Sequence, residues 1–209
     1  NKKTQIIKMF NNIAPKYDLL NNILSMGMDV IWRKKAIRKI NNNPKRILDV
    51  ATGTGELAIS AAKYTNAKIT AIDISKKMID IGLQKINKQK LNKKIEFQII
   101  DAEKLPFKDC SFDAVTVGFG IRNFENIDKG LSEIYRVLNN NSILVFLEPS
   151  EPKKGPVYFV YNIYFSYILP LLGGIISKDK HAYQYLRNSV QVFPDKQRMF
   201  QKLKKIGFK

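Results

Sequence analysis

The chain has 209 residues, of which 44% are hydrophobic and 26% are charged, and it contains one cysteine, Cys110. This composition predicts a folded domain and argues against a disordered chain, an intrachain disulfide framework and a cysteine-based zinc site. The net charge of +18 is interpreted as lysines spread over solvated helices rather than as a nucleic-acid or membrane surface, because the lysines stand singly or in pairs.

The first part of the chain, residues 3–42, is predicted to be helical. Within IWRKKAIRKI the spacing places four apolar residues near one helix face, namely Ile31, Ala36, Ile37 and Ile40. From Arg46 onward, short β-rich runs alternate with helix-length segments, which is typical of crossover units around a mostly parallel sheet. The predicted strands are 46–51, 68–74, 95–101, 112–119 and 142–148.

An uncharged segment, residues 156–176, follows the last predicted strand. Its length approaches that of a membrane span, but its tyrosines and Pro170 argue against a single spanning helix. We expect a helical cover over the active end of the sheet, with a buried structural helix and a peripheral membrane contact as alternatives. The charged start, NKKTQIIKMF, lacks the apolar region of a signal peptide. We therefore expect a cytoplasmic location, with association at the inner face of a membrane as the alternative.

The chain is predicted to form a single domain. Its parts are an N-terminal helical cap (1–42), a ligand-binding core (46–150), a helical substrate cover (151–194) and a last helix (195–209). The ending KKIGFK resembles the entrance to another strand, so we expect the final strands of the sheet to be missing.

The motif ILDVATGTGELA, residues 47–58, is an apolar run that ends in a glycine turn. Gly53 and Gly55 permit a sharp turn and a close approach of the backbone to a ligand. GTGELA also satisfies the dinucleotide fingerprint G-x-G-x-x-G/A, which is a weak signal when it stands alone. The residues around the turn must therefore indicate whether the ligand contains phosphates.

Acidic residues stand at three successive strand ends. Asp49 precedes the glycine turn, where it would repel a pyrophosphate but could hold an ammonium group directly or through water. Asp73 ends the second strand and could accept hydrogen bonds from both hydroxyls of a ribose, and Asp101 with Ala102 ends the third, where an adenine edge would lie. This series favours S-adenosylmethionine over a nicotinamide dinucleotide. The alternative is that each aspartate only caps the following helix.

Several longer motifs resemble the UbiE/MenG methyltransferases, over essentially the whole chain. They are MFNNIAPKYDLLNNILSMGMDVIWRKKA (9–36), ILDVATGTGELA, LPFKDCSFDAVTVGFGIRNFENIDKGLSEIYRVL (105–138), LEPSEP (147–152) and AYQYLRNSVQVFPD (182–195). This sequence departs from the family pattern at Glu56, at LNNNS (138–142), and at Pro149 and Glu151.

The resemblance implies the Rossmann-like α/β fold of a class I S-adenosylmethionine-dependent methyltransferase, with N-terminal helices and a helical insertion near the C-terminus. It implies a C-methyltransferase of quinone biosynthesis that converts demethylmenaquinol to menaquinol, with methylation of a ubiquinol precursor left open. It places cofactor contacts on Thr54, Asp73, Asp101 and Ala102, and a catalytic cluster on Tyr17, Arg122 and Asn123. Neither the resemblance nor the sequence pattern indicates a metal.

Arg122 reaches the active end of the sheet in GFGIRN. An arginine stays protonated, so we expect it to stabilise a phenolate while a water molecule carries the proton away. A surface salt bridge is the alternative role for Arg122, and a surface position at a helix start is the favoured interpretation of His181. The competing functions are methylation of RNA or of another small molecule, and non-catalytic membrane binding through residues 156–176.

Overall fold

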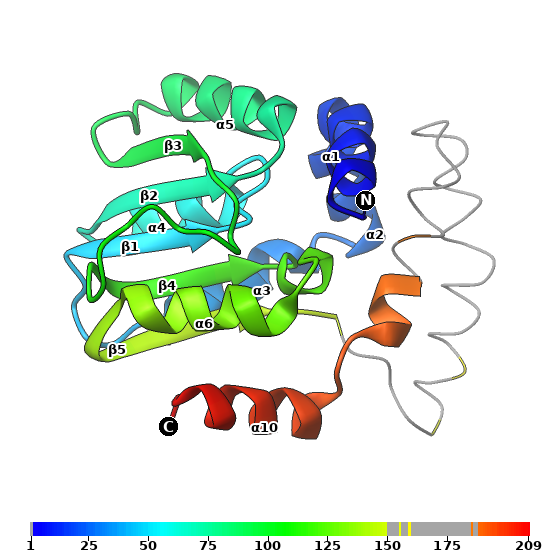
Figure 1. Cartoon of the computed structure of the whole chain (residues 1–209). Coiled ribbons are helices and arrows are strands. Elements are labelled where there is room, and N and C mark those ends of the chain that lie inside the picture. Colours follow the sequence, from blue (N-terminus) through cyan, green and yellow to red (C-terminus); the bar gives the residue numbers. More distant parts are fainter. Residues whose placement is uncertain (1, 150–154, 156–158, 160–184, 186–187) are drawn as a thin grey trace.

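The computed structural model describes residues 2–149, 155, 159, 185 and 188–209 of the chain (Figure 1). The strands are β1 (Arg46–Val50), β2 (Lys68–Asp73), β3 (Ile95–Ile99), β4 (Phe112–Gly118) and β5 (Leu138–Leu147). The helices are α1 (Lys2–Ile13), α2 (Tyr17–Leu24), α3 (Met28–Ile37), α4 (Glu56–Tyr64), α5 (Lys76–Lys88), α6 (Ile127–Val137) and α10 (Lys196–Ile206), with short 3₁₀ turns η1 (Ala14–Lys16) and η2 (Ile121–Asn123).

The five strands form one sheet in the order β3-β2-β1-β4-β5, and every neighbouring pair is parallel. Strand β1 lies in the centre, with β2 on one side and β4 on the other. The chain therefore reverses its direction across the sheet at β1, and ligands of open parallel sheets bind at such a point, beyond the carboxyl ends of the strands. The predicted mostly parallel α/β sheet is confirmed.

Helices cover both faces of the sheet, because successive side chains of a buried strand point to opposite faces. Ile47 of β1 packs in a cluster with Leu57 of α4 and Ile86 of α5. Leu48, its neighbour, packs in a second cluster with Leu131 of α6. Figure 1 shows α6 in front of the sheet, α3 and α4 behind it, and α10 below α6. The sheet is thus held rigid between two helical layers, and its carboxyl edge stays accessible.

Helices α1 and α2 lie beyond that carboxyl edge, at the end of the sheet to which the arrowheads point (Figure 1). Asn11 of α1 accepts hydrogen bonds through Oδ1 from Ser75 Oγ at 2.8 Å and from the backbone N–H of Lys77 at 3.2 Å. Lys2 Nζ donates to the carbonyl of Phe124 at 2.7 Å. These contacts fix α1 to the loops that follow β2 and β4.

The fifth strand starts earlier than the predicted residue 142. It begins at Leu138, directly after α6, and its pairing with β4 is irregular between Phe112 and Ala114, where the partner changes from Leu138 to Ile143. Asn141 has a φ of 61° in this stretch, a left-handed conformation that asparagine tolerates better than most residues. The segment 138–142 therefore enters the sheet through an irregular stretch.

The predicted inner face of 31–40 is wrong at one residue. Ala36, Ile37 and Ile40 are buried, but the side chain of Ile31 is 53% exposed. The inner face of α3 begins instead with Asp29, which is 4% exposed and hydrogen-bonded to a cation of its own helix. A polar pair on a buried helix face has no apolar periodicity, so the hydrophobic pattern could not identify it.

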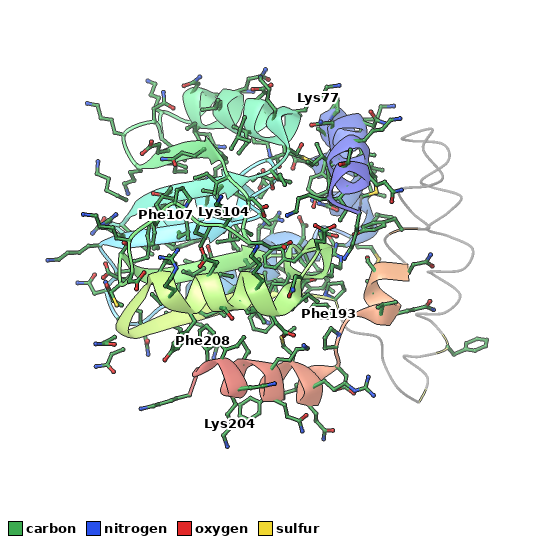
Figure 2. All side chains as sticks on the ribbon, viewed as in Figure 1. Lys77, Lys104, Phe107, Phe193, Lys204 and Phe208 are labelled. Carbon is green, nitrogen blue, oxygen red and sulfur yellow. The ribbon has the colours of Figure 1, made fainter. Side chains whose placement is uncertain are left out.

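The last helix, α10, is tied to the front layer by aromatic residues at its two ends. Phe193 and Phe208 pack against the cluster that includes α6 (Figure 2), and the ring of Phe208 lies 5.0 Å from that of Tyr135. Apart from residue 159, the predicted cover 156–176, which includes Pro170, lies outside the described residues, as does His181. Within the described ranges, no helix is long and apolar enough to cross a membrane.

Candidate active site

The glycine turn joins β1 to α4 at the centre of the carboxyl edge. Gly53 and Gly55 have φ values of 58° and 83°, a left-handed conformation that favours glycine. A Cβ on Gly55 would lie 2.5 Å from the ring of Phe97, whereas a Cβ on Gly53 would lie 3.7 Å from the ring of Tyr17. Gly55 thus packs tightly under a strand side chain, while Gly53 presents backbone toward the N-terminal helices.

Asp49 is completely buried at the end of β1. Its carboxylate accepts hydrogen bonds from the hydroxyls of Thr52 and Thr116, each at 2.5 Å. Burial raises the pKa of Asp49 to about 6, although both hydroxyls favour its charged form. A buried carboxylate with an elevated pKa at a strand end is a candidate binding group for a cation.

Asp73 and Asp101 occupy the next two strand ends. Asp73 accepts hydrogen bonds from the backbone N–H of Gly53 and of Ser75, both at 2.8 Å, and burial raises its pKa. Asp101 also loses hydration, but the hydrogen bond from Lys3 Nζ at 2.7 Å and that from the backbone N–H of Glu103 at 2.9 Å hold its pKa below the usual range. The hydrogen bond from the Gly53 N–H to Asp73 connects the glycine turn directly to the end of β2.

None of these aspartates is the N-cap residue of the helix that follows it. The N-cap of α4 is Gly55, that of α5 is Ser75 and that of α6 is Asn126. The side chains of Ser75 and Asn126 make the capping hydrogen bonds in the last two cases. Asp49 is nevertheless hydrogen-bonded to the backbone N–H of Ala58 in the first turn of α4, so the capping alternative is excluded for Asp73 and Asp101 but explains part of the surroundings of Asp49.

Two adjoining cavities meet at the glycine turn. The larger, of about 370 Å³, is lined by Tyr17, Asp49, Gly53 and Thr54, together with residues of α2 and α3. The smaller, of about 80 Å³, is lined by predicted site residues of the neighbouring strands, which are Tyr17, Gly53, Asp73, Asp101, Ala102 and Asn123. The structure thus brings the predicted cofactor residues together around two cavities that share Tyr17 and Gly53 in their walls, except that Gly55 lines neither cavity.

Thr54 is buried, and its hydroxyl is already engaged. Thr54 Oγ1 donates to Asp18 Oδ1 at 2.5 Å and accepts from Lys85 Nζ at 3.0 Å. Lys85 also forms ion pairs with Asp18 at 2.5 Å and with Glu56 at 2.6 Å. The predicted contact of Thr54 with a ligand carboxylate would therefore involve its backbone N–H.

Arg122 forms a buried ion pair with Glu148, a residue that the sequence analysis did not select. Arg122 Nη1 lies 2.7 Å from Glu148 Oε2, and the two side chains are 8% and 3% exposed. Glu148 Oε1 also accepts from the backbone N–H of Ile121 at 2.7 Å, and burial raises the pKa of Glu148. Among the described residues, Arg122 Nε has no hydrogen-bond partner. The surface-salt-bridge interpretation of Arg122 is therefore wrong.

A third, smaller cavity of about 60 Å³ brings together all three predicted catalytic residues, Tyr17, Arg122 and Asn123. Its other walls are mainly apolar side chains of α1 and α2. Tyr185, which the sequence analysis also missed, lines it and donates to Asn123 Oδ1 at 3.1 Å. Tyr17 lines all three cavities, and burial raises the pKa of its hydroxyl and that of Tyr185.

No sequence signal selects Glu148 or Tyr185 alone. Glu148 follows β5 within LEPSEP, and Tyr185 lies within AYQYLRNSVQVFPD, two stretches that carry the family resemblance. Their contacts with Arg122 and Asn123 join residues that are distant along the chain, so only the folded structure reveals them. Among the described residues, no group of three or more His, Cys, Asp or Glu side chains could hold a metal ion.

Comparison with known proteins decides the family. A model of the ubiE/COQ5 methyltransferase family matches residues 1–209. The chain belongs to this family. Demethylmenaquinone methyltransferase of Bacteroides fragilis is 44% identical over 209 residues, covering 99% of this chain and 85% of the relative. The ubiquinone/menaquinone biosynthesis C-methyltransferase UbiE of Geotalea daltonii is 43% identical over 211 residues, covering 100% and 89%.

A solved structure supports the fold of this ubiE/COQ5 family member. Phosphoethanolamine N-methyltransferase 2 of Haemonchus contortus, in complex with S-adenosyl-L-methionine, aligns with a TM-score of 0.62 and 19% identity over 85% of this chain and 36% of that chain. The fold is the Rossmann-like fold of class I methyltransferases. As a ubiE/COQ5 methyltransferase, the chain is an enzyme, and its methyl donor is S-adenosylmethionine.

Proposed function

We propose that this enzyme methylates a ring carbon of a demethylmenaquinol and so produces a menaquinol, with a ubiquinol precursor as a second substrate. The observation that carries the proposal is the position of Tyr17, Arg122 and Asn123 around one cavity beside the strand-end carboxylates. The relatives named demethylmenaquinone methyltransferase, at 41% identity or more, support this substrate class.

The strand-end residues fit the parts of S-adenosylmethionine. Buried Asp49 suits the ammonium group, directly or through water, and opposes a pyrophosphate. Asp73, held by the N–H of Gly53, suits the ribose hydroxyls, and Asp101 with Ala102 suits the adenine edge. When bound, the cofactor supplies an electrophilic methyl group on a sulfonium. Gly53 and Gly55 shape the turn, and the backbone N–H of Thr54 is available for the carboxylate.

On the substrate side, the ring must be activated as a phenolate. Loss of a phenolic proton makes the ortho carbon nucleophilic, and a positioned cation stabilises the oxygen that becomes negative. Arg122 supplies this cation and remains protonated throughout, so a water molecule accepts the phenolic proton. The methylated carbon then loses its own C–H proton to water, which restores the aromatic ring. Asn123 and Tyr17 hold the ring in place, and correct positioning contributes much of the rate.

A peripheral contact with the inner face of a membrane would give access to a prenylated substrate. Large apolar side chains are exposed along α2 and α3 and the turn between them, namely Leu19, Ile23, Met26, Met28, Val30, Ile31 and Trp32. Lys35, Arg38 and Lys39 are exposed beside them. Apolar side chains rimmed by cations are typical of a surface that binds anionic lipids. Leu19 and Val30 also line the larger cavity.

Methyl transfer from labelled S-adenosylmethionine to lipids tests the proposal. The enzyme is incubated with lipid extract from a strain that cannot methylate its quinones, in reduced form. We expect label in a prenylated naphthoquinone. Label that appears only in a benzoquinone would replace the principal substrate, and label in neither ring would refute quinol methylation.

Methylation of RNA is the competing function, and the net charge of +18 is its one supporting observation. A phosphate-driven interaction weakens steeply with salt. The same labelled cofactor is therefore offered with total RNA at low and at high salt. We expect no incorporation at either, and incorporation into RNA would favour the alternative.

A further inference from the structure

The largest of these three cavities has a strongly acidic wall that includes one arginine. Its lining includes four carboxylates, which belong to Asp18, Asp29, Asp49 and Glu56. Among the described residues that line it, Arg33 is the one cation. An acidic cavity favours a ligand with net positive charge, but a carboxylate on that ligand would be repelled unless it met Arg33.

Arg33 is held in place from its own helix. Ser25 Oγ donates to Asp29 Oδ1 at 2.8 Å, and Asp29 in turn accepts a short hydrogen bond through Oδ2 from Arg33 Nη2. The side chain of Arg33 is 11% exposed and that of Asp29 is 6% exposed. This chain of contacts from the end of α2 through Asp29 fixes the guanidinium and limits its rotamers.

Its contacts leave most of the guanidinium available. Within the described part of the chain, Arg33 contacts Asp29 and, at 3.7 Å, Glu56, and both contacts involve Nη2. A guanidinium has five N–H donors in a planar fork that matches a carboxylate. Lys85, the nearby second cation, is engaged with Asp18, Glu56 and the Thr54 hydroxyl. Arg33 is therefore the better candidate for a ligand anion in this cavity.

We propose that Arg33 binds the carboxylate of the methionine part of S-adenosylmethionine, opposite Asp49, which binds its ammonium group. This assignment rests on the proposed binding of the cofactor along the strand ends. The cavity then offers one anion and one cation to the two charges of an amino-acid head. Thr54 lines the same cavity, and its backbone N–H supplies a further hydrogen bond.

Binding calorimetry with two ligands that differ by one group tests the role of Arg33. S-adenosylhomocysteine has the carboxylate, and S-adenosyl-3-thiopropylamine keeps the amine but lacks the carboxylate. In the Arg33→Met variant we expect the affinity for S-adenosylhomocysteine to fall by about 10- to 100-fold, the range for a charged bidentate hydrogen bond. The affinity for S-adenosyl-3-thiopropylamine should change by less than about threefold, because this ligand has no carboxylate to interact with Arg33.

The exposed Arg38, which follows α3, gives a matched control. Arg38→Met removes the same charge from the next turn, and we expect it to leave both affinities unchanged. An equal loss for both ligands in Arg33→Met would show that Arg33 only maintains the structure, and no loss for either would refute the contact. If the unmodified enzyme bound neither ligand, the proposed cofactor placement would fail instead, so the two failures are distinguishable.

Discussion

At the scale of single residues, Asp49 links the cofactor site to pH. Its pKa is raised to about 6, first of all by burial. The folded state therefore holds a proton that the unfolded state releases, in the window between an ordinary aspartate pKa and pH 6. The free energy of unfolding consequently decreases as pH rises through this window, and the cost of the buried charge is fully present above it.

The Asp49→Asn substitution removes the free-energy cost of the buried charge, and it also removes the carboxylate proposed to bind the ammonium group of the cofactor. At pH 8 we expect a higher melting temperature, because a penalty of up to about 3 kcal/mol is relieved, with the difference shrinking toward pH 4. Affinity for S-adenosylhomocysteine should fall at least about tenfold. Thermal denaturation across pH 4 to 8 and calorimetry measure the two effects. A lower melting temperature at pH 8 would contradict the destabilising charge.

Asp113 provides a control of opposite sign. Burial acts to raise its pKa, but hydrogen bonds from the backbone N–H groups of Lys45 and Arg46 and from Asn139 lower it. Its charge therefore stabilises the fold above the ordinary aspartate pKa, and this stabilisation is lost as pH falls. Asp113→Asn should thus lower the melting temperature at pH 8, where Asp49→Asn raises it.

Glu148 is expected to matter for the rate rather than for cofactor affinity. In Glu148→Gln an amide replaces the carboxylate that holds Arg122 and the N–H of Ile121, which leaves a buried guanidinium without its ion-pair partner. We expect kcat to fall by about 10- to 100-fold. The affinity for S-adenosylhomocysteine should stay within about threefold, since Glu148 lines none of the three cavities.

The matched control for Glu148 is Glu133→Gln. Glu133 also accepts from a backbone N–H, that of Leu105, and from an arginine, Arg136, but it lies on α6 and lines none of the three cavities. We expect this variant to lose stability and keep its kcat. A similar drop of kcat in both variants would assign Glu148 a purely structural role.

The sequence predicts those candidate site residues whose position follows from a local pattern. Asp49, Asp73 and Asp101 stand directly at strand ends, so strand prediction alone brings them to one edge, and the structure places all three around the two adjoining cavities. Arg33 and Glu148 were not predicted as site residues, because their proposed roles depend on contacts that only the folded structure shows. Arg33 reads as one of several basic residues on a helix, and Glu148 is defined by contact with a residue 26 positions away.

At the scale of elements, α3 and α4 begin in the same unusual way. Gly27 and Gly55 are their N-caps, both are left-handed, with φ of 75° and 83°, and neither makes a side-chain cap. A Cβ on Gly55 would collide with the ring of Phe97 at 2.5 Å, whereas the nearest atom for Gly27 is Asn22 Nδ2 at 3.9 Å. Alanine at Gly27 would therefore introduce backbone strain alone, whereas alanine at Gly55 would introduce both backbone strain and steric crowding.

Alanine at each position should therefore cost different amounts. For Gly27→Ala we expect a loss of about 1–2 kcal/mol, the cost of a left-handed alanine. For Gly55→Ala we expect an additional 1–3 kcal/mol from overpacking. Phe97→Leu combined with Gly55→Ala should recover part of this additional loss. Urea denaturation of the variants measures the differences, and equal losses for the two single variants would contradict the predicted collision.

The helices and strands followed from the sequence where one pattern dominated. Four strands match their predicted ranges within two residues, because each is a short apolar run between loops. The start of β5 was missed because its register with β4 skips residues 139–142: Phe112 pairs with Leu138 and Ala114 with Ile143. The three asparagines form an irregular stretch in which Asn141 is left-handed, so the first paired residue, Leu138, is separated from the regular part of the strand. In α3, the buried ion pair of Asp29 replaces an apolar residue of the inner face.

At the scale of the whole molecule, the exposed apolar side chains of α2 and α3 and the cations beside them predict reversible membrane binding, to which the net charge adds a general attraction. The net charge is +18, and lysines such as Lys77 and Lys204 project from separate helices (Figure 2). We expect the enzyme to sediment with phosphatidylglycerol vesicles at low salt, and little with phosphatidylcholine vesicles. Binding should weaken at 0.5 M salt, because screening shortens the reach of charge to a few ångströms.

Two matched substitutions separate a specific surface from net charge alone. Ile31 on α3 and Val192 are both exposed, at 53% and 85%, and glutamate at either position lowers the net charge equally. If the α2–α3 surface contacts the lipid, Ile31→Glu should weaken vesicle binding at least about fivefold more than Val192→Glu, since it also removes apolar area from the interface. Equal effects would mean that the protein responds only to total charge, and absence of binding to either vesicle would refute the membrane contact.

Activity toward a water-soluble quinol with a truncated side chain should be the same in both variants, because neither substituted side chain lines the cavities. Activity toward the vesicle-bound quinol should fall only for Ile31→Glu.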